Sequence, residues 1–139
     1  MKSLSTLIRL NKFQLDEKKR ALKELQELAQ NLHSSLAQLK EEFDREQAIA
    51  KESFTAAQVF HQYKAAIEQR RATLLESINQ VDDEILGITN EMTDLFQDLK
   101  RFEITESERT LTSKKSRDKK EERALDDQAI VRYRRQQGS

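Results

Sequence analysis

Residues 60–102 read FHQYKAAIEQRRATLLESINQVDDEILGITNEMTDLFQDLKRF, and an apolar or aromatic residue returns at every seventh position of this stretch. These positions are Phe60, Ile67, Leu74, Val81, Ile88, Leu95 and Phe102. An apolar repeat of seven residues, held over this many heptads, is typical of α-helices wound around each other in a left-handed supercoil. The stretch therefore predicts one helix of a coiled coil, with these residues at core position d of its heptads.

The first half of the chain carries a matching stripe, which we assign to core position a. It comprises Ile8, Leu15, Leu22, Ala29, Leu36, Phe43 and Ala50. If the chain folds back on itself, facing residues of the antiparallel pair have numbers that add up to a constant value. A value of 110 pairs every residue of one stripe with one of the other. The sequence thus predicts an all-α fold, an antiparallel two-helix coiled-coil hairpin whose longer second helix projects as a C-terminal arm.

The heptad frame defines this constant only to within multiples of seven, so further core positions are needed to choose the register. These are the d positions of the first helix and the a positions of the second helix, which form the alternate core layers between the paired stripes. At 110, Glu46 faces Lys64, so two charged core positions form a pair of opposite sign, and Leu39 faces Arg71. At 103, the charged Lys64 faces the apolar Leu39, which is a worse core pairing than that of Lys64 with Glu46. At 117, Glu46 faces Arg71, and charge does not exclude this register.

Capping signals indicate where the helices begin. Ser3 is a good N-cap for the first helix. Thr55 followed by Gln58 has the spacing of a capping box, and Phe54 and Val59 have the spacing of a hydrophobic staple around it. The expected limits are about 4–51 for the first helix, 52–55 for the turn, 56–136 for the second helix and 103–139 for the arm, all within one domain of residues 1–139.

The composition agrees with long helices and argues against several classes of function. The chain has 139 residues, no proline, two glycines and 36% charged residues. Its 25 basic and 25 acidic residues cancel, so no overall field attracts nucleic acid, and we expect no nucleic-acid partner. No apolar run approaches the roughly 18 residues of a membrane span, and the N-terminus lacks the apolar region of a signal peptide. We expect a cytoplasmic protein without direct membrane insertion.

No residues of the chain show the pattern of a catalytic, cofactor-binding or metal-binding site. Cysteine is absent, and His33 and His61 have no second ligand at metal-binding spacing. There is no phosphate-binding loop or nucleophile motif, and two helices form a ridge rather than a pocket. The basic run at 114–120 contains Asp118 and is followed by two glutamates, as in a solvated helix face. We expect a non-enzymatic protein without a cofactor.

Four residues beside the seam lie at the spacing of a single helix face. They are Val59, Tyr63, Ala66 and Arg70. One hypothesis is that this stripe receives a partner, so that Tyr63 contacts the partner and not the first helix. The alternative is structural: Val59 serves the staple, Tyr63 covers the edge of the seam, and Arg70 is solvated.

Apolar residues outside the seam also gather near the two ends of the chain. Leu7, Leu10 and Phe13 lie at non-core positions of the first helix, and a small cluster near the C-terminus comprises Leu125, Ala129, Ile130 and Tyr133. Isolated apolar residues on a surface need no explanation. The alternative is that these residues dock a partner.

Two stretches resemble the flagellar export protein FliJ family, particularly its alphaproteobacterial members. They are residues 4–20, LSTLIRLNKFQLDEKKR, and residues 60–71, FHQYKAAIEQRR. Length and two-helix layout extend the resemblance over essentially the whole chain, and the Ala-Ile-Glu-Gln run just after the turn carries it best. The resemblance implies a coiled coil similar to the central stalk of rotary ATPases. It also implies a cytoplasmic component of the flagellar type III export apparatus, peripheral at the inner-membrane face.

The resemblance implies three partners: the hexameric export ATPase, the large transmembrane subunit of the export gate, and substrate chaperones. The family's gate-contact positions fall on Val59, Tyr63, Ala66 and Arg70, of which only Ala66 keeps the family's residue type. The stalk analogy implies ATPase contacts by Leu7, Leu10, Phe13, Leu125, Ile130 and Tyr133. Two rival functions are a generic coiled-coil scaffold or dimerisation module, and a central-stalk subunit of a true rotary ATPase, which would usually add a globular part.

Overall fold

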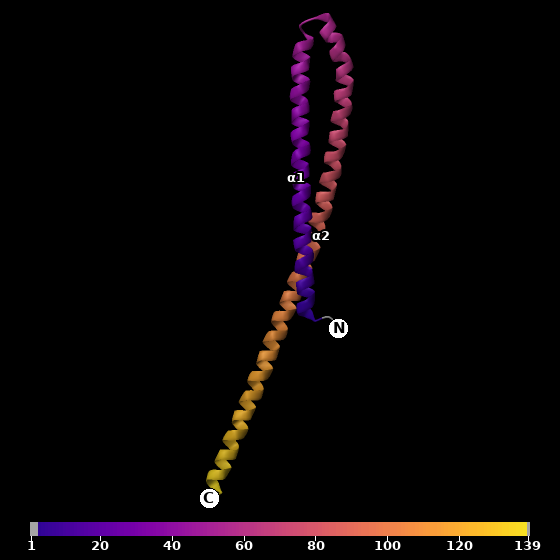
Figure 1. Cartoon of the computed structure of the whole chain (residues 1–139). Helices are drawn as coiled ribbons and strands as arrows, with labels where there is room; N and C mark the ends of the chain where they lie inside the picture. Colours follow the sequence, from indigo (N-terminus) through magenta and orange to yellow (C-terminus); the bar gives the residue numbers. More distant parts are fainter. Residues whose placement is uncertain (1–2, 139) are drawn as a thin grey trace. The chain divides into compact units, whose positions relative to one another are not determined.

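The computed structural model of the chain describes residues 3–138, which form two α-helices (Figure 1). α1 spans Leu4–Ala50 and α2 spans Phe54–Gln137, and no residue of the described range lies in a strand. The helices pack against each other, and α2 is the longer. The predicted all-α fold of two packed helices is therefore confirmed.

The contacts between Cα atoms group the chain into two compact units. One unit is Phe13–Leu95, and the other combines Met1–Lys12 with Phe96–Ser139. In the first unit α1 and α2 run antiparallel, joined by the turn between them (Figure 1). The single domain expected from the sequence stays a prediction, and its residues 1, 2 and 139 lie outside the described range.

The core of both units follows the two heptad stripes and their alternate layers. Every buried apolar side chain of residues 3–138 occupies an a or d position. These side chains are Leu15, Leu39, Ile67, Ile78 and Val81 in the first unit, and Ile8 and Leu99 in the second. The remaining core residues predicted from the stripes are half-buried: Leu22, Leu36, Phe43, Phe60, Leu74, Ile88, Leu95 and Phe102. Partial burial is expected, because a helix in a two-helix layer is covered on one side only.

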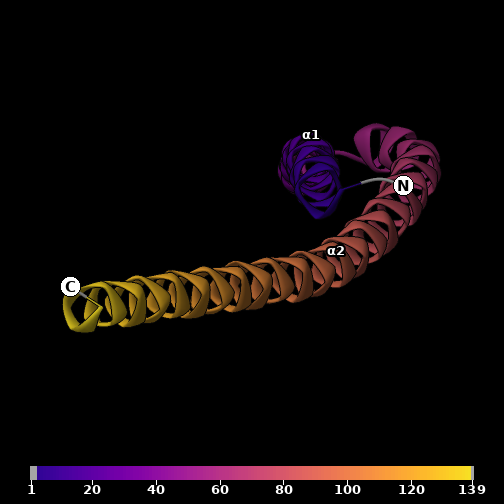
Figure 2. The same ribbon diagram turned by 90° about the horizontal axis from the view of Figure 1, so that it is seen from below.

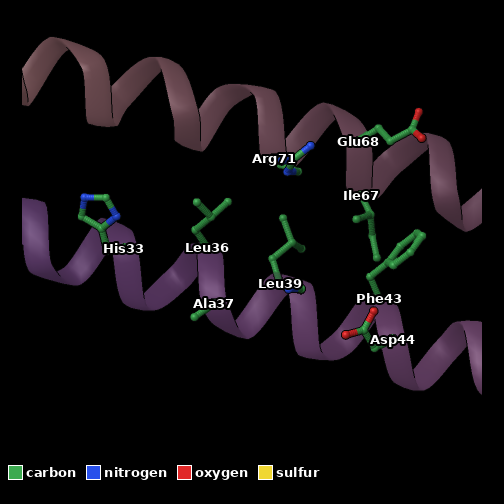
Figure 3. Close-up of a pocket in the computed structure, with 10 residues that line it drawn as sticks. His33, Leu36, Ala37, Leu39, Phe43, Asp44, Ile67, Glu68 and Arg71 are labelled. Atoms are coloured by element: carbon green, nitrogen blue, oxygen red, sulfur yellow. The ribbon is translucent and has the colours of Figure 1, made fainter.

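The register of the Phe13–Leu95 unit follows from contacts between the helices. Nζ of Lys18 lies 2.5 Å from Oε2 of Glu91, within one residue of the register in which facing numbers add up to 110. In Figure 3, Ile67 points toward Phe43, as that register predicts. The Phe43 and Phe60 ring centroids are 5.4 Å apart. Their residue numbers add up to 103, seven below the register at 110, so near the turn the two rings reach toward each other along the seam. In the alternative register at 117 they would be displaced by fourteen positions, or about 21 Å, and Lys18 and Glu91 would be displaced by eight, so that alternative is excluded.

Two charged residues that the heptad frame assigns to the core are exposed. Lys64 and Arg71 both lie at predicted a positions, and both are solvent-exposed. The predicted facing pair of Glu46 and Lys64 is not an ion pair, since neither residue takes part in a salt bridge within the described range. The physical reason is that the sides of a two-helix seam are open, so a long charged side chain reaches water without a buried partner.

The turn corrects the predicted start of the second helix. α2 begins at Phe54, and Ser53 is its N-cap: the backbone N–H of Ala56 donates to Oγ of Ser53 at 3.0 Å. The expected capping box of Thr55 and Gln58 is therefore wrong. The expected staple is wrong as well, because the side chains of Phe54 and Val59 are 79% and 64% exposed. The chain reverses within residues 51–53, so the serine hydroxyl next to the reversal caps the helix before Thr55 is reached.

The start of α1 matches the prediction from its sequence. Oγ of Ser3 accepts a hydrogen bond from the backbone N–H of Thr6 at 3.3 Å. The carbonyl oxygen of Ser3 accepts from the N–H groups of Thr6 and Leu7 at 3.1 and 3.2 Å. Ser3 thus satisfies donors of the first turn that have no partner inside the helix, and its role as N-cap is confirmed.

A buried asparagine interrupts the apolar core of the second unit. Asn11 occupies a d position and is only 5% exposed, and its Oδ1 atom has no hydrogen-bond partner among the described residues. A buried polar atom without a partner costs about 1–3 kcal/mol. Coiled coils tolerate such residues because a polar group at one core position disfavours other registers and oligomers.

α2 is curved within the Phe13–Leu95 unit, as the view in Figure 2 shows. Three threonine hydroxyls in this part of the helix bond back to the preceding turn. Thr73 donates to the carbonyl oxygen of Gln69 at 3.1 Å, Thr89 to that of Ile85 at 2.8 Å, and Thr93 to that of Thr89 at 3.0 Å. Such back-bonding competes with the helix ladder and often bends helices. Curvature allows α2 to follow α1, as the heptad repeat requires.

Candidate docking surfaces

The four residues predicted as one face of α2 are largely accessible. Val59 is 64% exposed, and Ala66 and Arg70 are also exposed. Tyr63, by contrast, is half-buried. All four lie on the first turns of α2 after Ser53, inside the Phe13–Leu95 unit. We call these four residues the α2 face.

Tyr63 is held by α1. Its hydroxyl donates a hydrogen bond to Oε1 of Glu42. This bond, together with desolvation and the negative charges of Glu42 and Glu46, raises the pKa of Tyr63 to about 12, against a smaller lowering by Arg70. The expectation that Tyr63 does not contact the first helix is therefore wrong. The reason is geometric: Glu42 and Tyr63 both occupy position g, and g residues face each other along one edge of this antiparallel seam.

A groove lined mainly by residues with polar side chains continues the α2 face along the same edge of the seam. It has a volume of about 440 Å³ and contains Arg70 of the face and Glu42, the partner of Tyr63. We call it the glutamine groove, after the two amide side chains in its walls. Its lining residues are Ser35, Gln38, Leu39 and Glu42 of α1, and Gln69, Arg70, Thr73 and Leu74 of α2.

A larger and more apolar groove opens between the helices in the same unit. It has a volume of about 550 Å³, and Leu36, Leu39 and Phe43 of α1 point into it beside Ile67 and Arg71 of α2 (Figure 3). Arg71 lines this groove and is exposed, because its charged side chain reaches water through the open side of the seam. Charged side chains at its rim have both signs, with Lys40 and Arg71 opposed by Asp44 and Glu68.

The residues expected to bind the ATPase are exposed, with one exception. Leu125, Ile130 and Tyr133 are 66%, 50% and 61% exposed near the end of α2. Leu10 and Phe13 of α1 are 40% and 55% exposed, whereas Leu7 is half-buried. Every residue from 106 to 138 is exposed. Tyr133 makes a local contact, accepting a hydrogen bond from Nε2 of Gln137 at 2.7 Å.

The described residues contain no arrangement suited to metal binding or membrane crossing. No group of three or more His, Cys, Asp or Glu side chains within residues 3–138 converges on a point that holds a metal ion. In the same range, no helical segment combines the length and the apolarity that a bilayer span requires. The accessible features of this part of the chain are thus helix faces and grooves, which suit contacts with other macromolecules.

Comparison with known families decides the assignment. The profile of the family described as "FliJ: Flagellar FliJ protein" matches residues 1–138. The chain belongs to the FliJ family. It is therefore a component of the flagellar export apparatus, and the FliJ family is a non-enzymatic part of that apparatus. Comparisons with curated proteins and with solved structures gave no match.

Sequence reasoning from heptads and from the FliJ resemblance missed the α1 residues that lie beside the α2 face. Glu42 and Gln38 were not among the predicted binding residues, yet they line the groove beside the α2 face. A usable signal existed, because Glu42 occupies position g of α1 and Tyr63 and Arg70 occupy position g of α2. In an antiparallel pair, g residues of the two helices meet along one edge of the seam, so these side chains share a surface.

Proposed function

We propose that this member of the FliJ family acts as a stalk-like adaptor of the flagellar export apparatus. It binds the hexameric export ATPase through the apolar residues near the start of α1 and the end of α2. It binds the large transmembrane subunit of the export gate through the α2 face, and it escorts substrate chaperones. It works in the cytoplasm, peripherally at the inner-membrane face. The family match over residues 1–138 is the observation that carries the proposal.

The end of α2 supports the ATPase part of the proposal. Leu125, Ile130 and Tyr133 are at least half exposed, and no other described segment covers them. At about 100° per residue, these three side chains fall within an arc of about 140°, so they form one apolar side of the helix. An apolar helix side that no other described segment covers suits docking against a partner protein.

The α2 face supports the gate part of the proposal. Val59, Ala66 and Arg70 lie outside the seam, and all three are exposed and accessible to a partner. Tyr63 adds an aromatic ring of the kind that carries much of the energy at protein interfaces. Its bond to Glu42 holds the side chain in place, which reduces the entropy lost on docking.

Two pairs of matched variants of the full chain test the two parts separately. Replacing Leu125 and Ile130 by Asp should weaken ATPase binding at least tenfold, whereas Leu111→Asp, at another exposed apolar position of α2 (53%), should not. Ala66→Asp should abolish binding to the purified cytoplasmic domain of the gate subunit. Its control is Ala65→Asp, since Ala65 is also exposed but lies off the face.

The outcomes separate this function from the generic alternatives. Selective loss of one partner in each experiment supports the adaptor. If the unmodified chain binds neither the ATPase nor the gate domain and only associates with itself, it is a coiled-coil scaffold and the proposal is overturned. Melting temperatures of all variants should agree within a few degrees, because every substituted residue is exposed.

A further inference from the structure

We propose that the apolar groove beside Leu36 and Ile67 binds a second copy of this chain, so that two hairpins pack antiparallel, groove against groove. The groove lies on the edge of the seam opposite to that of Tyr63 and Glu42. Its off-seam lining residues occupy heptad positions e and b, whereas Tyr63 and Glu42 occupy position g. The dimer therefore leaves the α2 face uncovered, and it does not depend on the partners proposed above.

The groove has an apolar floor that the two-helix seam leaves partly open. Leu36 and Phe43 of α1 are half-buried and point into the groove beside Ile67 of α2 (Figure 3). Ala37, at the rim, is exposed and too small to obstruct a second helix. A hairpin that lies along this floor removes its remaining apolar surface from water, which is favourable.

Four charged side chains at the rim form two pairs at different levels of the hairpin. In the register at 110, Lys40 and Arg71 lie at the same level to within one residue, and Asp44 and Glu68 lie about one turn closer to residues 51–53. Figure 3 shows Arg71 displaced along the helices from Asp44 and Glu68. None of the four takes part in a salt bridge within the described range. The rim thus changes sign along the groove, and its charges are available to a partner.

This charge pattern matches a second copy that runs in the opposite direction. A two-fold axis across the helices sets α1 against α1 and α2 against α2 and inverts the levels. Lys40 of each copy then meets Asp44 of the other copy, and Arg71 meets Glu68, so every rim charge faces one of opposite sign. A two-fold axis along the hairpin would keep the levels and set Lys40 against Arg71 and Asp44 against Glu68. Like charges across an interface disfavour it, so the antiparallel pair is the self-complementary one.

The burial of the groove residues makes this dimer a weak one. Leu39 and Ile67 are already buried within one chain, so the apolar surface that the second copy covers belongs chiefly to Leu36 and Phe43. Exposed ion pairs add little affinity and mainly fix the orientation of the two copies. Small interfaces of this kind are typical of transient complexes. We expect a Kd of roughly 100 µM, so the chain is largely monomeric at low micromolar concentration.

Sedimentation equilibrium of the full chain from about 10 µM to about 1 mM, a range that brackets the expected Kd, tests the dimer. Lys40→Glu combined with Arg71→Glu makes the rim acidic throughout, and Asp44→Lys combined with Glu68→Lys makes it basic throughout. Each double variant should dimerise at least tenfold more weakly than the unmodified chain. An equimolar mixture of the two should dimerise again, because each supplies the sign that the other lacks.

A matched control separates the rim from net charge. Arg20→Glu combined with Arg45→Glu changes the net charge by as much as the acidic rim variant does, at exposed positions f and c of α1 away from the groove. At about 0.15 M salt, where charges at a distance are screened, this control should change the Kd by less than about twofold. It should also fail to dimerise with the basic rim variant.

Introduced cysteines test the antiparallel direction, because the chain has no cysteine of its own. If Lys40 meets Asp44 of the other copy, Ala37 faces Gln47 of the other copy. The full chain with Ala37→Cys and Gln47→Cys should therefore form disulfide-linked dimers under mild oxidation. Within one chain the two positions are ten helical residues or about 15 Å apart, too far for an internal disulfide. Ala37→Cys alone is the control and should stay monomeric.

Three results would overturn the inference. The first is a chain that stays monomeric up to about 1 mM. The second is a dimer that the rim variants leave intact, or that the control weakens equally, since it would use another surface. The third is a dimer in which the two introduced cysteines do not crosslink. Melting temperatures of the rim variants should match that of the unmodified chain, because all four rim residues are exposed.

Discussion

The hydroxyl of Tyr63 on α2 is bonded to Oε1 of Glu42 on α1, outside the apolar seam. The bond ties the two helices together near the turn, next to the exposed residues Val59 and Ala66. Tyr63 is therefore at once a part of the hairpin and a part of the surface beside it. Substitutions at Tyr63 should affect both stability and partner binding, whereas Ala66→Asp isolates the surface.

The first prediction concerns pH. The pKa of Tyr63 is raised from 10.0 to about 12, first by the hydrogen bond to Glu42. A group with a raised folded-state pKa stabilises the fold fully below its unfolded-state pKa and loses this contribution as pH rises through the folded-state value. The unmodified chain should therefore lose stability between about pH 10 and 12 relative to Tyr63→Phe. Chemical denaturation of both proteins across this range measures the difference.

A control for the pH prediction uses the partner residue. In Glu42→Ala the bond and the nearby charge are gone, so the pKa of Tyr63 should fall back toward its ordinary value of 10.0. Ultraviolet absorbance of tyrosinate, recorded in the Tyr133→Phe background, follows this single ring. An unchanged titration in Glu42→Ala would show that Glu42 is not the cause of the shift.

The second prediction compares two leucines one turn apart on α1. Leu39 is 4% exposed, whereas Leu36 is half-buried at the apolar groove. Leu39→Ala should lower the free energy of unfolding by about 2–5 kcal/mol. Leu36→Ala should cost only about 1 kcal/mol, because less apolar surface leaves water when its side chain folds. Urea denaturation gives both values, and equal costs would show that the groove is closed in solution.

The third prediction concerns the glycine within α2. A Cβ atom added at Gly87 meets nothing within 4 Å. Gly87→Ala should therefore raise the free energy of unfolding by about 1 kcal/mol, the difference in helix propensity between the two residues. The reverse change at an exposed position of the same helix, Ala65→Gly, should lower it by a similar amount. A loss of stability in Gly87→Ala would reveal a close contact at this position.

The fourth prediction concerns the buried asparagine. Because Oδ1 of Asn11 has no partner among the described residues, Asn11→Leu should raise the free energy of unfolding by about 1–3 kcal/mol. Asn90→Leu, at an exposed position, should not. Size-exclusion chromatography of Asn11→Leu should show some self-association, since the polar group no longer disfavours other pairings. If stability falls instead, the oxygen is bonded to water in the native protein.

The sequence by itself determined which residues form the core. Heptad spacing is a local property of a helix, so it selects the inward-facing side chains before any partner is known. The buried side chains Leu15, Ile67 and Val81 lie on the predicted stripes, and Leu39 lies in an alternate core layer between them. The N-cap at Ser3 is equally local, because a serine hydroxyl reaches only the backbone of the first turn.

The tertiary structure alone decided how the two stripes meet and what lies beside them. A stripe that repeats every seven residues is compatible with several registers, and only contacts such as Lys18 with Glu91 distinguish them. The choice of Ser53 over Thr55 as the cap depends on where the chain reverses. The bond between Tyr63 and Glu42 and the groove beside it also require both helices in place. The heptad repeat of one helix does not predict which residue of the other helix lies opposite an off-seam position. The register between the two helices decides that pairing.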